Sequence, residues 1–162
     1  MSKLIRLIFL DIDGPMIPSG MFLIDRDASY KRVYSPIAVG VINHLCHETK
    51  AKIVFNTTHN MFDNPFTNKS VIEDSIDQGI KRGHLFNNGS KTKYPDIPRL
   101  DAIKLWLKEH EMTEENAVWI AFDDVDFKHD NLILVDYDVG LTPQHLNEGI
   151  KKLGKGREFL VL

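Results

Sequence analysis

An apolar run that ends abruptly in two carboxylates is the feature that most constrains how this chain can fold. Residues 4–10 are apolar apart from Arg6, which is typical of a strand buried on both faces of a parallel sheet. Side chains two residues apart in a strand point the same way, so Asp11 and Asp13 can face one site beyond its C-terminal end. Open α/β sheets bind ligands at that edge. Aspartates also form turns, so the rest of the chain must decide between a turn and a site.

Composition favours one globular domain of ordinary character. The chain has 162 residues, of which 43% are hydrophobic and 27% charged, enough to bury a sizeable core. The net charge of -3 gives no general electrostatic reason to expect nucleic-acid binding. A single cysteine, Cys46, excludes an intrachain disulfide and fits a reducing compartment. No run approaches the roughly 20 apolar residues of a membrane span, and the N-terminal run is too short for a signal peptide, so we expect a cytoplasmic protein without a membrane partner.

Strand-like and helix-like segments alternate along the chain. Beyond the first run, the strand-like segments are 51–55, 117–122 and 132–135, with 159–162 as a candidate edge strand. The helix-like segments begin at Ser35, Ser70, Pro98 and Thr142. The second of these is predicted to continue through Ile80, and residues 84–86 read as a further short strand. The alternation predicts an α/β fold, a three-layer α/β/α sandwich around a mostly parallel, Rossmann-like sheet.

One segment near the N-terminus does not fit the alternation. A Pro-Ser-Gly turn at 18–20, between two apolar pieces, predicts a short hairpin or flap over residues 15–34. Its charged part, residues 25–34, reads as a solvated loop, with a basic rim facing a substrate as the alternative. Neither this segment nor residues 60–98 is long enough to form an extra domain. We therefore expect a single domain, 1–162, with a small flap and an open site.

Polar residues follow the other predicted strands as well. Segment 51–55 ends in Asn-Thr-Thr at 56–58, and segment 117–122 ends in Asp123 and Asp124. Because parallel strands end at one edge, these side chains should gather with the two aspartates of the first strand. Four carboxylates in one place raise each other's pKa values unless a cation is bound. Oxygen-only ligands suit Mg²⁺, so the pattern predicts a magnesium site that recruits phosphate.

A basic side chain is expected beside this cluster. Arg99 lies in the first turn of a predicted helix, where the helix dipole disfavours a positive charge unless an anion is near. That placement indicates that Arg99 meets something negative. Lys104 is the alternative cation, although a lysine in the middle of an exposed helix face is usually solvated.

The ordered motifs resemble those of the haloacid dehalogenase (HAD) superfamily of phosphotransferases. Residues 9–14, Phe-Leu-Asp-Ile-Asp-Gly, resemble its first motif, and residues 56–58 lie where its Thr/Ser motif belongs. Residues 120–124 lie where its acidic metal motif belongs. Segments 99–106 and 136–142 further resemble the small HAD domains attached to RNA-repair (Swiss-army-knife) proteins. The resemblance implies a HAD-type sandwich with a minimal cap and a phosphatase activity.

The resemblance implies a catalytic and metal-binding role for four aspartates. Asp11 would be the nucleophile that forms an aspartyl-phosphate, and Asp13 would protonate the leaving oxygen and then activate water. Asp123 and Asp124 would hold Mg²⁺ together with the Asp11 carboxylate and the backbone carbonyl of Asp13.

The resemblance also implies how the phosphoryl group is bound. Thr57 would donate a hydrogen bond to its oxygens, with Thr58 or Asn56 as alternatives of register. Arg99, or in its place Lys104, would neutralise the phosphoryl and nucleophile charges. Relatives usually carry a lysine in this third motif, and this chain departs from that pattern.

The expected activity is Mg²⁺-dependent phosphomonoester hydrolysis, with a nucleotide or a nucleic-acid terminal phosphate as the phosphorylated partner. RNA-repair relatives often follow the second motif with Trp-Arg, whereas this chain has His59-Asn60. Two alternatives stay open: a phosphoacceptor switch that stores a stable aspartyl-phosphate, and a catalytically degenerate HAD domain that serves as an interaction module. The oligomeric state is left open.

Overall fold

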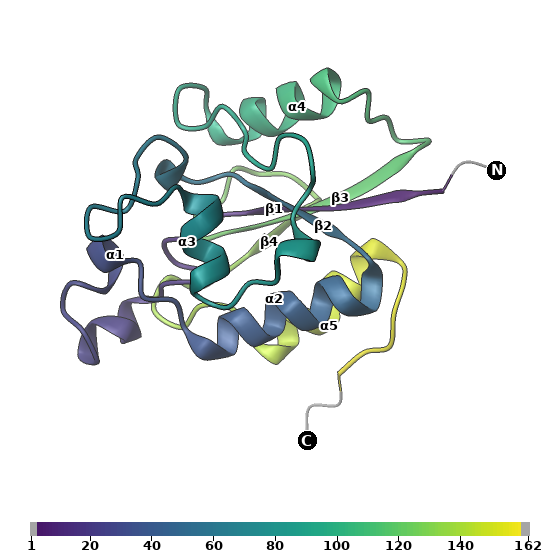
Figure 1. Ribbon diagram of the computed structural model, residues 1–162. Coiled ribbons are helices and arrows are strands. Elements are labelled where there is room, and N and C mark those ends of the chain that lie inside the picture. Colours follow the sequence, from purple (N-terminus) through teal and green to yellow (C-terminus); the bar gives the residue numbers. More distant parts are fainter. Residues whose placement is uncertain (1–2, 160–162) are drawn as a thin grey trace.

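The computed structural model describes residues 3–159 and contains one sheet of four parallel strands. The strands are β1 (Ile5–Leu10), β2 (Lys52–Phe55), β3 (Ala117–Asp123) and β4 (Leu132–Leu134), in the spatial order β2-β1-β3-β4. Helices α2 (Pro36–Thr49) and α5 (Pro143–Leu153) lie on one face of the sheet, and α4 (Arg99–Glu109) lies on the other (Figure 1). The predicted α/β sandwich is therefore confirmed, and all pairings of the sheet are parallel.

The register of the sheet aligns the C-terminal ends of its three longest strands. Leu10 at the end of β1 pairs with Phe55 at the end of β2 and with Phe122 in β3. The next residues along each strand, Asp11 and Asp123 among them, therefore leave the sheet at the same edge. This edge lies on the left of Figure 1, where α1 (Ala28–Lys31) and α3 (Val71–Asp77) also lie.

Strand β1 is buried on both faces, as its apolar run predicts. Ile8 and Leu10 belong to the core between the sheet and α2 with α5. Leu7 and Phe9 belong to the core under α4, where the Phe9 ring meets Trp106 edge-on with 5.5 Å between centroids. Packing on both sides fixes the strand, and with it the position of the aspartates that follow it.

Two long helices begin at the predicted residues. The Ser35 hydroxyl accepts a hydrogen bond from the Ala38 backbone N–H, and Pro36 occupies the first turn of α2. At α5, Thr142 is the N-cap residue, its backbone N–H donates to Nδ1 of His145 at 3.0 Å, and Pro143 occupies the first turn. Gly154 ends this helix with a left-handed backbone at φ 71°.

The flap segment differs from the predicted hairpin. It contains a 3-10 helix, η1 (Ser19–Leu23), followed by the short helix α1, and an isolated bridge joins Ile17 to Asp13 of the first motif. The residues expected to form the hairpin turn helical instead, and Met21 of η1 is buried. The loop over 25–34 is also less solvated than expected, since Arg32 is buried.

Three further predicted elements differ from the structure or lie partly outside the described residues. Helix α3 ends at Asp77, short of Ile80, and the chain then turns through Gly79 at φ 112°. Residues 84–86 do not form a strand: a 3-10 helix, η3 (Arg82–His84), precedes a single bridge from Leu85 to β2. Phe159 is not in a strand, and the rest of the predicted edge strand lies outside the described residues. Within residues 3–159, no helix has the length and apolarity that crossing a membrane requires.

Candidate functional site

Three aspartates converge at the edge where the strands end. Asp11, Asp123 and Asp124 each place one carboxylate oxygen within 4.8 Å of the other two. Asp11 and Asp123 are almost completely buried, and the Asp11 backbone N–H donates to the Phe122 carbonyl at 3.1 Å, so the two strand ends are tied together. The carboxylates therefore meet on rigid elements, where their positions are set by the sheet.

The buried carboxylates carry a charge that protein groups do not fully compensate. Burial raises the pKa of Asp11 well above its usual value, and the neighbouring charge of Asp123 adds to the effect, against the opposing charge of Arg99. Burial likewise raises the pKa of Asp123 to about 6, again against Arg99. A bound cation would relieve both groups.

The donor set fits a hard divalent cation. All three side chains offer oxygen, the ligand type that Mg²⁺ prefers, and the cluster contains neither nitrogen nor sulfur. The three oxygens lie within 4.8 Å of one another, which is close enough for one ion to gather them as ligands.

Gly14 makes room for the third carboxylate. Its backbone has φ 98°, a conformation that residues with a side chain rarely adopt. A Cβ at this position would lie 2.8 Å from Cβ and Cγ of Asp124. The glycine that follows the two aspartates of the first motif is thus required both by the turn and by the close approach of Asp124.

Asp13 makes contacts of its own. Its Oδ1 accepts a hydrogen bond from the Ser29 hydroxyl at 2.9 Å, and its Oδ2 lies 3.2 Å from Nε2 of His59. Burial alone would raise the pKa of Asp13, but the hydrogen bonds and charge of His59, with Ser29, outweigh burial and lower it. The expectation of four converging carboxylates is therefore wrong for the Asp13 side chain, since the close cluster among the described residues holds three.

Arg99 lies against the carboxylate cluster. Its Nη1 is 3.6 Å from Oδ2 of Asp123, and its guanidinium carbon lies 4.6 Å from the centre of the Tyr94 ring. Within residues 3–159, Nη1 is buried and has no hydrogen-bond partner. A buried guanidinium with a free N–H beside carboxylates is well placed to donate to an anionic ligand.

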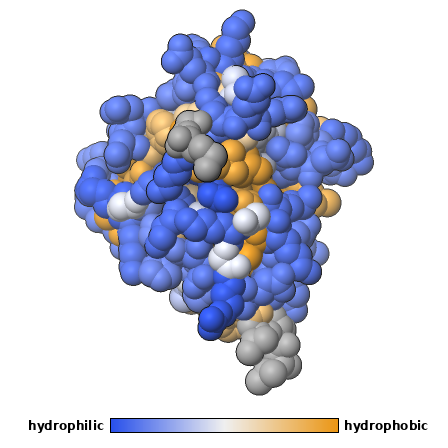
Figure 2. Space-filling view, turned by 90° about the vertical axis from the view of Figure 1, so that its right-hand side faces the viewer, coloured by the Kyte–Doolittle hydropathy of each residue, from blue (hydrophilic) through white to orange (hydrophobic). Residues whose placement is uncertain are grey.

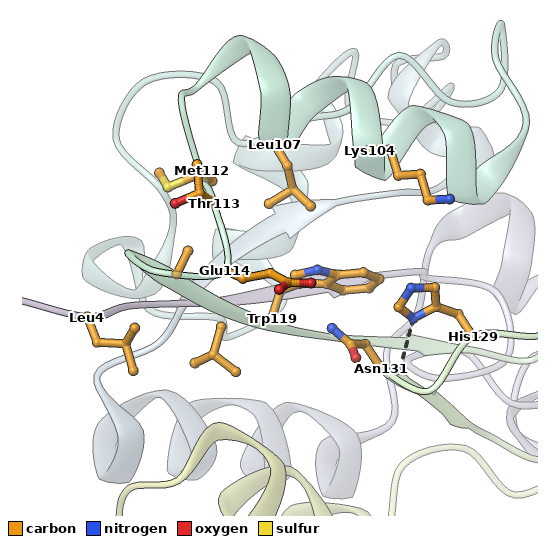
Figure 3. A pocket seen from close by; sticks show the side chains of 11 residues that line it. Leu4, Lys104, Leu107, Met112, Thr113, Glu114, Trp119, His129 and Asn131 are labelled. Carbon is orange, nitrogen blue, oxygen red and sulfur yellow. Dashed lines mark hydrogen bonds between the residues drawn. The ribbon is translucent and has the colours of Figure 1, made fainter.

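Lys104 lies elsewhere on the same helix. Its side chain is exposed and lines a pocket of about 550 Å³ with Leu107, Trp119 and His129 over the first half of β3 (Figure 3). That pocket contains none of the three clustered aspartates.

The polar cluster after β2 divides into three environments. Thr57 is fully buried, and its Oγ1 accepts from the His59 backbone N–H at 3.3 Å. The Asn56 amide is occupied: Oδ1 accepts from the Thr92 hydroxyl at 2.6 Å, and Nδ2 donates to the Arg99 carbonyl at 3.4 Å. Thr58 is exposed. Asn56 thus holds the start of α4, and so Arg99, in place.

The comparison with known families agrees with this geometry. Residues 7–146 match the family described as the HAD domain in Swiss Army Knife RNA repair proteins. The chain belongs to this HAD family. No curated protein and no solved structure gives a significant match. The match begins within β1 and ends within α5, so it covers the sheet apart from the first two residues of β1 and includes every residue of the carboxylate cluster.

Three further residues belong to the HAD domain's site, although no role was predicted for them from the sequence: Ser29, His59 and Tyr94. The first two contact Asp13, and the third lies beneath Arg99. His59 follows directly after the Asn-Thr-Thr segment at the strand edge, so its position in the polar cluster was a usable signal. Ser29 and Tyr94 lie in segments without such a signal, and only the folded chain brings them to the site.

The opposite edge of the HAD domain, where the strands begin, has another character. Hydrophilic side chains cover most of it (Figure 2), and five lysines line one pocket there. These are Lys3, Lys50, Lys52, Lys81 and Lys155. The clustered carboxylates and this basic edge therefore lie at opposite ends of the sheet.

Proposed function

We propose that this HAD domain is a Mg²⁺-dependent phosphomonoester hydrolase that works through an aspartyl-phosphate on Asp11. The observation that carries the proposal is the buried cluster of Asp11, Asp123 and Asp124 with Arg99 beside it at the ligand-binding edge of the sheet. HAD domains are usually phosphatases, and the family match supports that class of chemistry.

The clustered carboxylates and the backbone carbonyl of Asp13 would hold the metal. When bound, Mg²⁺ supplies positive charge that offsets the charges of the phosphate oxygens and of the Asp11 carboxylate. Arg99 supports the same task from the protein side, because its buried Nη1 is free to donate to a phosphate oxygen. Thr57, or Thr58 in the neighbouring register, would donate a further hydrogen bond to the phosphoryl group.

Two steps then follow on the protein's own residues. The Asp11 carboxylate attacks phosphorus while the bond from phosphorus to the ester oxygen breaks, and Asp13 gives its proton to that oxygen. Asp13, now a carboxylate, takes a proton from a water molecule that attacks the aspartyl-phosphate. Inorganic phosphate leaves, and the free carboxylate of Asp11 is restored.

The proposed substrate is a nucleotide or a nucleic-acid terminal phosphate. Among residues 3–159, the segment between β1 and α2 contains only two short helical turns, which supports an open site with room for a bulky substrate. Asp13 favours turnover over a stable phosphoacceptor switch, because an acid/base group beside the nucleophile promotes hydrolysis of the intermediate.

Hydrolysis of a generic aryl phosphate, measured with and without Mg²⁺, tests the activity. A panel of esters that includes 5′- and 3′-phosphorylated oligonucleotides tests the substrate. We expect Mg²⁺-dependent turnover that falls by at least about 10³-fold in Asp11→Asn, since it removes the nucleophile. Asp77→Asn, on the exposed side of α3, is the matched control and should keep full activity.

Each other outcome identifies an alternative. Turnover that survives Asp11→Asn contradicts the mechanism. A phosphoenzyme that forms on Asp11 and persists without turnover identifies a phosphoacceptor switch. Absence of both, in folded protein supplied with Mg²⁺, identifies an interaction module.

A further inference from the structure

A pocket of about 600 Å³ opens beside the proposed acid, Asp13. Its lining includes Ser29, Tyr30 and Arg32 from the flap, and His59 and Phe62 from the loop after β2. Two of these residues, Ser29 and His59, are the ones that contact the Asp13 carboxylate. The pocket therefore lies next to the group that is proposed to protonate the leaving oxygen.

This position assigns the pocket to one part of a substrate. In phosphomonoester hydrolysis, the proton from Asp13 goes to the oxygen that carries the organic part of the ester. That organic part must lie on the Asp13 side of the phosphorus, while the phosphoryl group lies by Asp11 and Arg99. The pocket is thus on the leaving-group side of the site.

The walls of the pocket present flat apolar surface to solvent. Phe62 is 65% exposed and Tyr30 is 60% exposed, high fractions for aromatic side chains. The Tyr30 ring is held by Phe66, which meets it edge-on with 4.9 Å between centroids. Exposed rings that line a pocket are typical stacking surfaces for nucleobases.

Arg32 adds a buried hydrogen-bond donor that has no acceptor. The side chain is 1% exposed, and its Nη2 donates to the Phe62 carbonyl. Its Nη1 is buried and has no hydrogen-bond partner within the described part of the chain. A buried guanidinium N–H without an acceptor is costly, and a ligand that brings one would remove this cost. Nucleobase edges carry such acceptors, and arginine is a common partner for them.

We propose that this pocket is a leaving-group subsite that binds a nucleobase, with the base against Phe62 and Tyr30 and an acceptor on its edge bonded to Nη1 of Arg32. The inference rests on the proposed function and specifies the part of the substrate that the enzyme selects. The volume is within the range of small-ligand pockets, which is about 300–1,000 Å³.

A pair of substrates with the same leaving alcohol provides the test. A nucleoside 5′-monophosphate and ribose 5-phosphate both release a primary alcohol of ribose, and the base is the main difference between them. We expect kcat/KM to be at least about tenfold higher for the nucleotide, the scale of one base stacked on an aromatic ring. Phe62→Ala and Tyr30→Ala should each remove most of this preference and change kcat/KM for ribose 5-phosphate less than twofold.

Two further variants sharpen the test. Arg32→Met should lower kcat/KM for the nucleotide selectively. Because Arg32 is buried and this change could disturb folding, circular dichroism accompanies it, and Phe62→Ala carries the test if the variant unfolds. Phe159→Ala removes an exposed ring that packs on His44 of α2, and as the matched control it should leave the preference unchanged.

The outcomes separate this inference from the proposed function. Equal kcat/KM for the two esters, or an equal loss for both in Phe62→Ala, overturns the subsite and leaves the phosphatase intact. If no ester is hydrolysed, binding of adenosine and guanosine is measured directly: binding that Phe62→Ala weakens supports the subsite, and absence of binding overturns it. Phosphorylated oligonucleotides, compared with mononucleotides, show whether the bound base belongs to a free nucleotide or to a chain end.

Discussion

Nε2 of His59 lies 3.2 Å from Oδ2 of Asp13, a contact between residues 46 apart in the sequence. Ser29 holds the other oxygen of the same carboxylate from the flap. These two contacts offset the effect of burial and lower the pKa of Asp13. The acidity of the proposed proton donor is therefore influenced by two residues that lie outside the strand end, Ser29 in α1 and His59 in a 3-10 helix over 58–60.

We expect His59→Ala to raise the pKa of Asp13, because burial then acts with less opposition. Asp13 must carry a proton to serve the leaving oxygen, so the decline of kcat/KM for an alkyl phosphate that follows deprotonation of Asp13 should move to higher pH. Measured pH profiles of the variant and the parent check this. His44→Ala, which removes a partner of Glu48 on α2, should not change the profile. A profile that stays in place, or moves to lower pH, contradicts the role of His59.

The stability of the metal-free protein should fall as pH rises between 3.8 and about 6, the unfolded and folded pKa values of Asp123. Because the folded value is the higher one, the folded state retains a proton in this interval that the unfolded state releases. Asp11 acts in the same direction. Thermal unfolding across this range, in chelator, measures the effect.

Mg²⁺ should reverse this loss at neutral pH. At 100 times the dissociation constant it should stabilise the fold by about 2.7 kcal/mol, which corresponds to a rise in Tm of roughly 5–10 °C for a domain of this size. At the same Mg²⁺ concentration, the rise in Tm should be much smaller at pH 5, where protons compete with Mg²⁺ for the carboxylates of Asp11 and Asp123. An equal rise at both pH values would argue against binding at this cluster.

Asp124→Asn should stabilise the metal-free protein at pH 7 and weaken Mg²⁺ binding. The Asp124 charge contributes to the raised pKa values of both Asp11 and Asp123, so its removal lowers the repulsion in the folded state. A gain of about 1 kcal/mol is the expected order, the scale of one pKa unit. Chemical denaturation with and without metal checks both effects, and loss of stability in chelator would contradict the account.

Gly14→Ala should impair activity by more than its effect on folding explains. The new Cβ meets Asp124 at 2.8 Å, and the backbone at φ 98° is strained for alanine, so a loss of about 1–3 kcal/mol in unfolding free energy is expected. Mg²⁺ affinity should fall as well, because Asp124 is displaced. Gly40→Ala is the matched control: it lies within α2 with no atom within 4 Å of the new Cβ, and should be neutral or stabilising.

The strands and the carboxylates at their ends could be predicted because their signals are local. The run that becomes β1 is apolar on both faces, and the parallel register then brings Asp11 to Asp123 without further information. Arg99 was identifiable for a similar reason, since a cation in the first turn of a helix needs a nearby anion.

The flap and the surroundings of Asp13 could not be predicted in the same way. The contacts of Ser29 and His59 with Asp13 join a strand end to two short helical turns, whose positions depend on tertiary packing rather than on a repeat in the sequence. Arg32 lies in a charged segment that is typical of solvated residues, yet it is buried, and its guanidinium donates to the Phe62 carbonyl. Such long-range partners leave no periodic pattern.

The shared use of Ser29 and His59 has a consequence for protein engineering. Both side chains line the pocket proposed for the leaving group, and both hold the Asp13 carboxylate. Grafting new loops at this place to broaden the range of accepted esters would also retune the proton donor. Libraries that keep these two residues and vary Tyr30 and Phe62 would separate selectivity from turnover.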